Sequence, residues 1–281
     1  MKTSSFKIAI LTLLIASCQN KTGNKTNDGS DSLTKTTPEQ VASKPFRLST
    51  KRDTITADVS NTAVIVIDME NDFGTKGGMF DRAGVDISAI QKAVEPTAKV
   101  LDAARKAGIK IIYIKMAYQP DLSDIGAKGS PNYLGHIYAM HVGDTITNPT
   151  GAKSRILIRG NWGTEIVPAL TPHNDDRVMY KNRFSSFYKT ELDSVLKQLN
   201  TKYLIVTGCT TTICVESTVR DAMFRDYSPI VLEDCTAEPF EYNGPASNHK
   251  ASLFMMQRVF GWVSNSQEFI KAVSGQAGNS K

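Results

Sequence analysis

The chain has 281 residues, of which 41% are hydrophobic and 22% charged, and it carries a formal net charge of +5. These values are those of an ordinary globular protein, and the length allows one large domain or two small ones. The lysines and arginines form no dense stripe with interleaved aromatic residues, so we expect no nucleic-acid partner.

The first residues have the pattern of an export signal. Lys2 and Lys7 provide a basic start, and the apolar run Ile8–Ser17 is too short to span a bilayer but fits the core of a signal peptide. The run ends in IASC, which resembles a bacterial lipobox, where the cysteine is lipidated and becomes the mature N-terminus. We therefore expect a lipoprotein-type signal peptide over residues 1–18, a lipid on Cys18, and a periplasmic or surface-facing location in the cell envelope. Membrane contact would be through the lipid only; a plain secretory signal with an incidental cysteine is the alternative.

The next stretch, residues 19–58, is expected to be a flexible tether. From Gln19 to Pro38 it is rich in small and polar residues and holds almost no large apolar side chain, so it cannot bury enough surface to offset its ordering entropy. The tether would lead to one globular domain over residues 59–275. Residues 276–281 are expected to be a disordered tail.

From Thr62 the pattern changes to strands that alternate with helices. The run Ala63–Ile67 is apolar and largely β-branched, which is typical of a strand buried on both faces. Further strands are expected at Lys110–Lys115, Arg177–Tyr180, Tyr203–Thr207 and Pro229–Leu232, and helices at Ile90–Ala107, Glu191–Gln198, Ile213–Asp226, Ala246–Gln257 and Gln267–Val273. The alternation predicts an α/β protein with three α/β/α layers, an open and mainly parallel sheet of about six strands with helices on both faces. The irregular span 117–153 is long enough to be functional, as a cover over a site or as an oligomer contact.

Three reactive side chains follow three of the predicted strands. Asp68 comes after the strand Ala63–Ile67, Lys181 after Arg177–Tyr180, and Cys214 begins a helix shortly after Tyr203–Thr207. Ligands of an open parallel sheet bind beyond the carboxyl ends of its strands, so we expect the three to converge there. A thiol at a helix start and beside a lysine has a lowered pKa and becomes a nucleophile, and a carboxylate can carry its proton.

Each of these residues also has a structural interpretation. A cysteine is often a small buried hydrophobe, Asp68 alone would only cap a turn, and Lys181 alone would be a solvated strand end. Cys214, however, lies off the apolar stripe of its helix, and the three residues together favour catalysis. Structural roles are expected for Cys209 and Cys235. If Cys18 carries lipid, three cysteines remain, which is an odd number for a disulfide framework.

Three segments resemble the signature regions of the isochorismatase-like cysteine hydrolases. They are VIVIDMENDF (64–73), VMYKNRFSSF (178–187) and VTGCTTTICVESTVRDA (206–222), and the likeness runs from about Thr62 to Val263. The resemblance implies hydrolysis of an amide or ureide through a thioester-type intermediate, with Asp68, Lys181 and Cys214 as the catalytic triad. It also implies an oxyanion hole formed by the backbone N–H groups of Thr210 and Cys214, and a cis peptide bond between Cys209 and Thr210.

Within this family the chain is most similar to the ureidoacrylate amidohydrolases, with biuret hydrolases nearby. The segments that carry this likeness are GGMFDRAG (77–84), GSPNY (129–133), RGNWGTEIVPAL (159–170), CVESTVRDAMF (214–224) and FGWVS (260–264). We therefore expect a C–N hydrolase that acts on a small linear amide or ureide and releases ammonia or an amine. Because members of the family are commonly oligomers, the resemblance also implies a homo-oligomer.

Two positions depart from the family pattern and leave the substrate open. Glu70 stands where members usually have Gln, and Met116 stands where ureidoacrylate enzymes have a polar residue facing the substrate. The residues expected to line the substrate pocket are Glu70, Asn71, Phe73, Met116, Tyr118 and Trp162.

Other functions in and outside this family remain as alternatives. Nicotinamidases add a metal site with an Asp-x-His pair after the second strand, a pair that is lacking in MAYQP (116–120), and His136 and His141 are too weakly spaced to predict zinc. We expect neither a metal nor another cofactor. A biuret or N-carbamoyl hydrolase, an isochorismatase-type activity and a non-catalytic surface lipoprotein that binds a ligand are the other possibilities.

Overall fold

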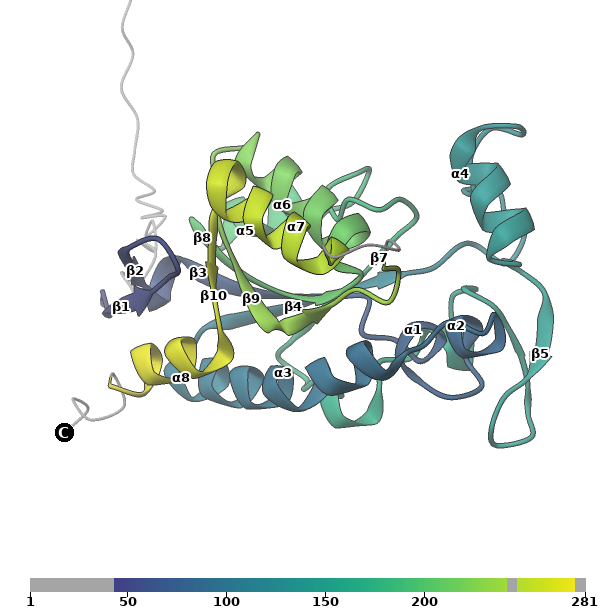
Figure 1. Cartoon of the computed structure of the whole chain (residues 1–281), viewed down its shortest axis with the longest axis horizontal. Coiled ribbons are helices and arrows are strands. Elements are labelled where there is room, and N and C mark those ends of the chain that lie inside the picture. Colours follow the sequence, from purple (N-terminus) through teal and green to yellow (C-terminus); the bar gives the residue numbers. More distant parts are fainter. Residues whose placement is uncertain (1–42, 242–246, 276–281) are drawn as a thin grey trace, which may run out of the picture. The chain divides into compact units, whose positions relative to one another are not determined.

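A six-stranded parallel sheet forms the centre of the structure (Figure 1), a computed structural model that describes residues 43–241 and 247–275. The strands lie in the order β10-β9-β8-β3-β4-β7, and every neighbouring pair is parallel. Their bounds are β3 Thr62–Ile67, β4 Lys110–Met116, β7 Arg177–Lys181, β8 Tyr203–Cys209, β9 Ser228–Ala237 and β10 Trp262–Ser264. The predicted parallel sheet is confirmed, and β10 supplies a sixth strand to the five predicted from named segments.

Helices cover both faces of this sheet. Figure 1 shows α3 (Ser88–Ala107) and α8 (Ser266–Ser274) on one face and α5 (Leu192–Gln198), α6 (Glu216–Met223) and α7 (Asn248–Met255) on the other. The predicted three-layer α/β/α architecture is therefore confirmed.

Strand β3 shows why a continuous apolar run is needed at the centre. Val64 and Val66 belong to the core shared with α3 and α8, whereas Ala63, Ile65 and Ile67 belong to the core shared with α5, α6 and α7. Since successive side chains of a strand point to opposite faces, a strand covered on both faces favours apolar residues at every central position. After the apolar run Ala63–Ile67 the strand ends, and the charged side chain of Asp68 follows it.

The tether predicted over residues 19–58 includes two strands that belong to the folded domain. β1 (Pro45–Ser49) and β2 (Thr54–Asp58) form an antiparallel hairpin. Phe46 and Leu48 alternate with exposed residues and are buried in the core on the α3 side, where the ring of Phe46 packs edge-on against Phe269 at 6.4 Å between centroids. The alternation of apolar and polar residues in β1 is typical of a half-buried strand. It was missed because it is short and the residues around it are mostly polar.

Two predicted helices differ in detail from the observed ones. The helix expected over Ile213–Asp226 begins with a π-helical turn, Thr211–Val215, and continues as α6. The helix expected over Ala246–Gln257 is α7, followed by a second π-helical turn at Met256–Phe260. Residue 246, the expected signal peptide with Cys18, and the expected tail 276–281 lie outside the described residues.

The span 117–153, which we name the covering segment, lies beyond the carboxyl ends of the strands (Figure 1). It contains α4 (Pro131–Leu134), a π-helical turn (Gly135–Ala139) and β5 (Thr145–Thr147), which pairs with β6 (Lys153–Arg155). The short helices α1 (Asn71–Gly74) and α2 (Met79–Arg82) follow β3 at the same edge. No helix within the described ranges is long and apolar enough to cross a membrane.

Candidate active site

The sheet changes direction of winding between β3 and β8. From β3 the chain adds β4 and β7 on one side, and it then returns to place β8, β9 and β10 on the other. Such a reversal leaves a crevice at the carboxyl ends of the two strands, where ligands of open α/β sheets bind. Asp68 directly follows β3, the turn with Cys214 follows β8, and Lys181 is the last residue of β7.

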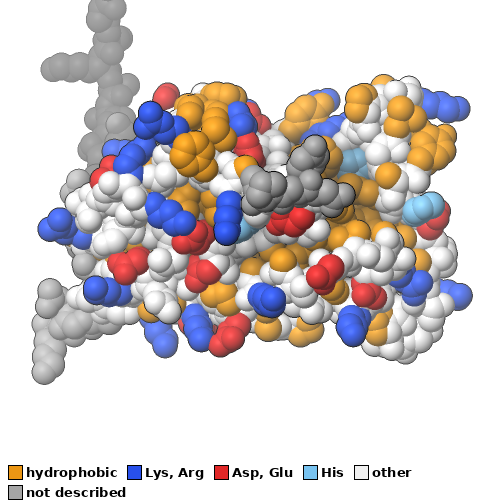
Figure 2. Space-filling model, viewed as in Figure 1, with side chains coloured by type: hydrophobic (Ala, Val, Ile, Leu, Met, Phe, Trp, Pro, Cys, Tyr) orange, Lys and Arg blue, Asp and Glu red, His pale blue; other side chains and the backbone are white. Residues whose placement is uncertain are grey.

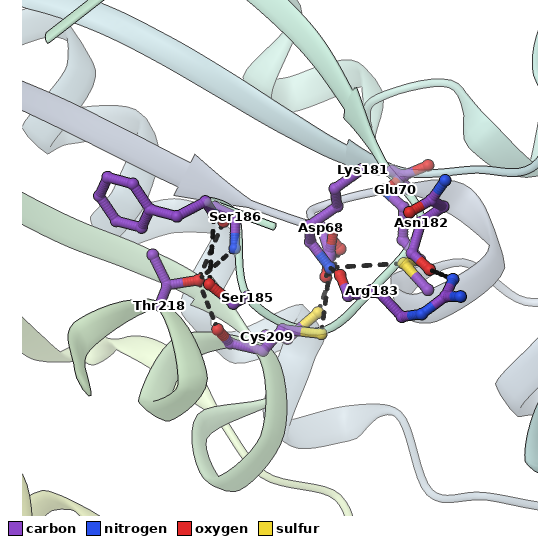
Figure 3. Close-up of polar contacts among 12 residues, drawn as sticks. Asp68, Glu70, Lys181, Asn182, Arg183, Ser185, Ser186, Cys209 and Thr218 are labelled. Carbon is purple, nitrogen blue, oxygen red and sulfur yellow. Dashed lines mark hydrogen bonds and ion pairs between the residues drawn. The ribbon is translucent and has the colours of Figure 1, made fainter. Parts of the chain in front are cut away.

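The three predicted catalytic side chains meet in this crevice. Nζ of Lys181 lies 2.7 Å from Oδ2 of Asp68 and 3.2 Å from Sγ of Cys214. The same ammonium group donates to the backbone carbonyl of Arg183 at 3.2 Å, which fixes its direction. Figure 3 shows Lys181 extended across the end of the sheet to Asp68. All three side chains are buried, so the ion pair is screened little by water.

Burial governs the protonation of the thiol. The pKa of Cys214 is raised, first by removal from water and then by the negative charge of Asp68, while Lys181 opposes both. The sequence-based expectation of a lowered pKa was therefore wrong, because the thiol is deeply buried as well as close to a helix start. Burial lowers the pKa of Lys181, but the contacts with Asp68 and Cys214 outweigh burial and hold that pKa above its ordinary value. At rest the site thus holds a neutral thiol beside the ammonium group of Lys181.

The backbone at the end of β8, before the turn with Cys214, lies close to β3. The peptide bond between Cys209 and Thr210 is cis, as the resemblance implied. Gly208 has a φ of 119°, and a Cβ atom there would overlap the backbone of Ile67, so only glycine fits. Asp68 itself has a φ of 53°, in the left-handed region that aspartate tolerates better than most residues.

Cys214 lines a narrow, mostly apolar pocket. The other lining residues are Phe73, Phe80, Met116, His136, Met140, Leu157, Phe184, Thr210, Ile213 and Phe240. Its open volume is about 20 Å³, room for about one water molecule. A wider cavity of about 630 Å³ shares the side chains of Phe80, Met140 and Phe240 with it. Figure 2 shows hydrophobic side chains gathered in the hollow on the right of this face. Among the described residues, no group of three His, Cys, Asp or Glu side chains is placed to hold a metal ion.

Comparison with known proteins identifies the family. The model of the isochorismatase domain matches residues 62–268. The chain belongs to the isochorismatase family. It is 37% identical over 227 residues to the ureidoacrylate amidohydrolase RutB of Methylorubrum extorquens, covering 81% of this chain and 88% of that enzyme.

Solved structures of isochorismatase-like hydrolases have the same fold. A cysteine hydrolase from Pseudomonas syringae pv. phaseolicola aligns with a TM-score of 0.65 and 28% identity, over 78% of this chain and 95% of that one. The N-carbamoylsarcosine amidase from Thermoplasma acidophilum aligns with a TM-score of 0.54 and 26% identity, over 73% and 96% of the two chains. The family resemblance seen in the three signature segments is therefore confirmed.

Only two of the six predicted pocket residues line the pocket, Phe73 and Met116. Glu70 lies behind Met116, whose backbone N–H donates to Oε1 of Glu70 at 2.6 Å, so this carboxyl group supports the end of β4 instead of facing the pocket. Burial and the charge of Asp68 raise the pKa of Glu70 well above its usual range.

The other three predicted residues have structural contacts. The Asn71 amide donates to the carbonyl oxygen of Trp162 at 2.9 Å, so these two residues hold their loops together outside the pocket. Tyr118 is fully buried, and its hydroxyl donates to the carbonyl oxygen of Asn182 at 3.3 Å. A polar or aromatic residue near a strand end can either line the pocket or hold neighbouring loops together. The sequence does not distinguish these two roles.

Several pocket residues were missed by sequence reasoning. His136 and Met140 come from the covering segment, which bears out its predicted position over the site. Phe184 follows β7 and Phe240 follows β9, so both come from loops at the same sheet edge. The position of Phe184 just beyond Lys181 is the one signal that the sequence offered, because residues after a strand end face the same crevice.

Proposed function

We propose that the protein is a cysteine hydrolase that cleaves a C–N bond of a small linear amide or ureide, of the kind that ureidoacrylate represents. One observation carries the proposal: the thiol of Cys214, the carboxylate of Asp68 and the ammonium group of Lys181 are in mutual contact at the carboxyl edge of the sheet. The similarity to RutB enzymes and to an N-carbamoylsarcosine amidase supports C–N hydrolysis over other reactions.

The first half of the reaction transfers the acyl group to sulfur. As Sγ of Cys214 attacks the carbonyl carbon, its proton passes to Asp68. The negative charge that develops on the carbonyl oxygen is met by the backbone N–H groups of Thr210 and Cys214. The C–N bond then breaks, Asp68 gives its proton to the leaving nitrogen, and an amine or ammonia departs from a thioester.

The second half restores the thiol. Asp68 takes a proton from a water molecule, whose oxygen attacks the thioester carbon. The C–S bond breaks, the proton returns to sulfur, and the acid product leaves; a carbamate product breaks down to carbon dioxide and ammonia. Because proton transfer accompanies each attack, the raised pKa of Cys214 is compatible with this route.

Lys181 has an electrostatic role in both halves. Its contact with Asp68 favours the ionised carboxylate that accepts the proton, and so opposes the burial that raises the pKa of Asp68. Its contact with Sγ stabilises the negative charge that forms on sulfur when the C–S bond breaks.

The test compares two cysteine variants in an ammonia-release assay. Purified protein is offered ureidoacrylate, biuret, N-carbamoyl amino acids and nicotinamide. Cys214→Ala is expected to abolish release while the protein remains folded by circular dichroism. Cys235→Ala, at another buried thiol, is the matched control and is expected to retain activity. Activity that survives in Cys214→Ala would refute the covalent mechanism.

We also propose that the protein is lipid-anchored in the cell envelope through Cys18 and that it is a homo-oligomer. The lipobox-like sequence IASC supports the lipid anchor. The homo-oligomer is supported by the resemblance to a family whose members are commonly oligomers. Metabolic labelling with an alkyne fatty acid should mark the wild type and not Cys18→Ser, which should also leave the membrane fraction. Light scattering of the protein without residues 1–42 gives its oligomeric state, and a monomer would contradict the second proposal.

A further inference from the structure

His136 is a buried polar residue of the pocket that the proposed reaction does not use. It lies in the π-helical turn of the covering segment, is 1% exposed, and lines the pocket together with Cys214. Its ring packs edge-on against Tyr118 at 5.3 Å and tilted against Phe184 at 5.6 Å between centroids. These two rings fix the plane of the imidazole.

The hydrogen bonding of His136 determines its tautomer. Nδ1 lies 2.7 Å from the backbone carbonyl oxygen of Asn132. A carbonyl oxygen only accepts, so Nδ1 carries the hydrogen atom. Burial and the nearby charges of Lys181 and Arg183 lower the pKa of His136, whereas the bond to Asn132 raises it less. The ring is therefore neutral, and Nε2 holds a free lone pair.

This lone pair has no partner among the described residues. Nε2 of His136 is buried without a hydrogen bond, in a pocket whose walls are mostly Phe, Met, Leu and Ile side chains. Leaving such an atom unpaired costs free energy, so unsatisfied buried polar atoms in a site are candidates for ligand contacts. The bond from Nδ1 to Asn132 directs Nε2 to the opposite side of the ring, away from the backbone of the covering segment.

The chemistry of a ureide supplies the missing donor. A carbonyl carbon bonded to Cys214 would direct its oxygen to backbone N–H donors, so the remaining substituent in the carbonyl plane needs a different environment. In a ureide that substituent is an NH₂ group, which donates hydrogen bonds; in a simple N-acyl compound it is a carbon that donates none. We propose that Nε2 of His136 accepts a hydrogen bond from the NH₂ group of the substrate, and that His136 thereby selects ureides over amides of the same shape. This assignment rests on the proposed C–N hydrolase function.

An isosteric pair of compounds tests the assignment. N-carbamoyl-β-alanine and N-acetyl-β-alanine differ by NH₂ against CH₃, and kcat/KM is measured for both. His136→Phe keeps an aromatic ring between Tyr118 and Phe184 but removes the acceptor. It is expected to lower kcat/KM for the carbamoyl compound by about tenfold to a hundredfold, the effect of one unpaired buried donor, and to leave the acetyl compound within about twofold.

Two further variants separate hydrogen bonding from packing. His136→Gln carries an amide oxygen that can accept at similar reach, so it is expected to recover part of the preference for the carbamoyl compound. His173→Phe is the matched control, because His173 is exposed and precedes β7 at the opposite edge of the sheet. It is expected to behave as the wild type. Equal losses on both compounds in His136→Phe, or no loss on either, would overturn the role of His136.

Failure of the proposed function gives a different result. If the wild type hydrolyses neither compound nor any other linear amide or ureide, the hydrolase proposal fails. The role of His136 is then decided by calorimetric binding of the two compounds to Cys214→Ala protein, with and without His136→Phe. A preference for the carbamoyl compound that His136→Phe removes supports the assignment. Equal affinities, including no measurable binding of either compound, overturn it.

Discussion

Replacing Lys181 by Met tests whether the buried ion pair organises the site. The substitution removes the ammonium group but nearly preserves the volume of the side chain, and it leaves the carboxylate of Asp68 buried without its partner. At the observed 2.7 Å and an effective dielectric constant of about 20, the attraction between the two charges is about 6 kcal/mol. Much of this offsets the desolvation of the ions. Removing one partner of such a pair is expected to cost about 3–5 kcal/mol of unfolding free energy.

Urea denaturation at pH 7.5 measures this cost in a double-mutant cycle of Lys181→Met and Asp68→Asn. Each single variant leaves one buried charge, whereas the double variant leaves none, so it should lose less stability than the sum of the two single losses by about 2 kcal/mol or more. Lys99→Met is the control, because Lys99 pairs with Glu95 at the same 2.7 Å but on the surface. It is expected to cost less than about 1 kcal/mol. Additive single losses, or a large loss in the control, would show that burial of the pair is not the cause.

Three other substitutions test particular contacts. Glu70→Gln should raise the unfolding temperature relative to the wild type, by an amount that grows as pH rises above 4.5. The pKa of Glu70 is higher in the native than in the unfolded protein, so the wild type loses stability as pH rises over that range. An equal gain at pH 4 and pH 8 would contradict this. Gly163→Ala should cost about 1–3 kcal/mol in urea denaturation because its Cβ would overlap the carboxylate of Asp72, whereas Gly135→Ala, with open space around it, should cost nothing. Phe46→Ala should cost about 3–5 kcal/mol if the hairpin is part of the core, and under about 0.5 kcal/mol if that residue were in an exposed tether.

The sheet and the triad were predictable because both depend on strong, local patterns. A continuous apolar run such as β3 indicates a strand buried on both faces, and parallel strands place their carboxyl ends at one edge. Asp68, Lys181 and Cys214 therefore had to lie at the same edge once the strands were located. The hairpin at residues 45–58 was missed because its buried face has few residues within a polar stretch.

The walls of the pocket and the state of the thiol were not predictable in this way. His136, Phe184 and Phe240 come from three different connections, and nothing in the sequence indicates how those loops fold over one another. The position of Cys214 near a helix start suggested a lowered pKa, but the extent of burial depends on the same loops. Glu70 was expected in the pocket because it stands where members of the family usually have Gln, yet its side chain turns to the backbone of Met116.

The origin of the pocket walls has a consequence for how enzymes with this sheet diverge. The reacting groups are attached to strand ends in the rigid core, whereas much of the pocket wall belongs to the covering segment and to the connections after β3, β7 and β9. Loops tolerate substitutions, insertions and deletions far better than central strands. New substrates can thus be acquired by altering one connection at a time, with the order of bond making and bond breaking inherited unchanged.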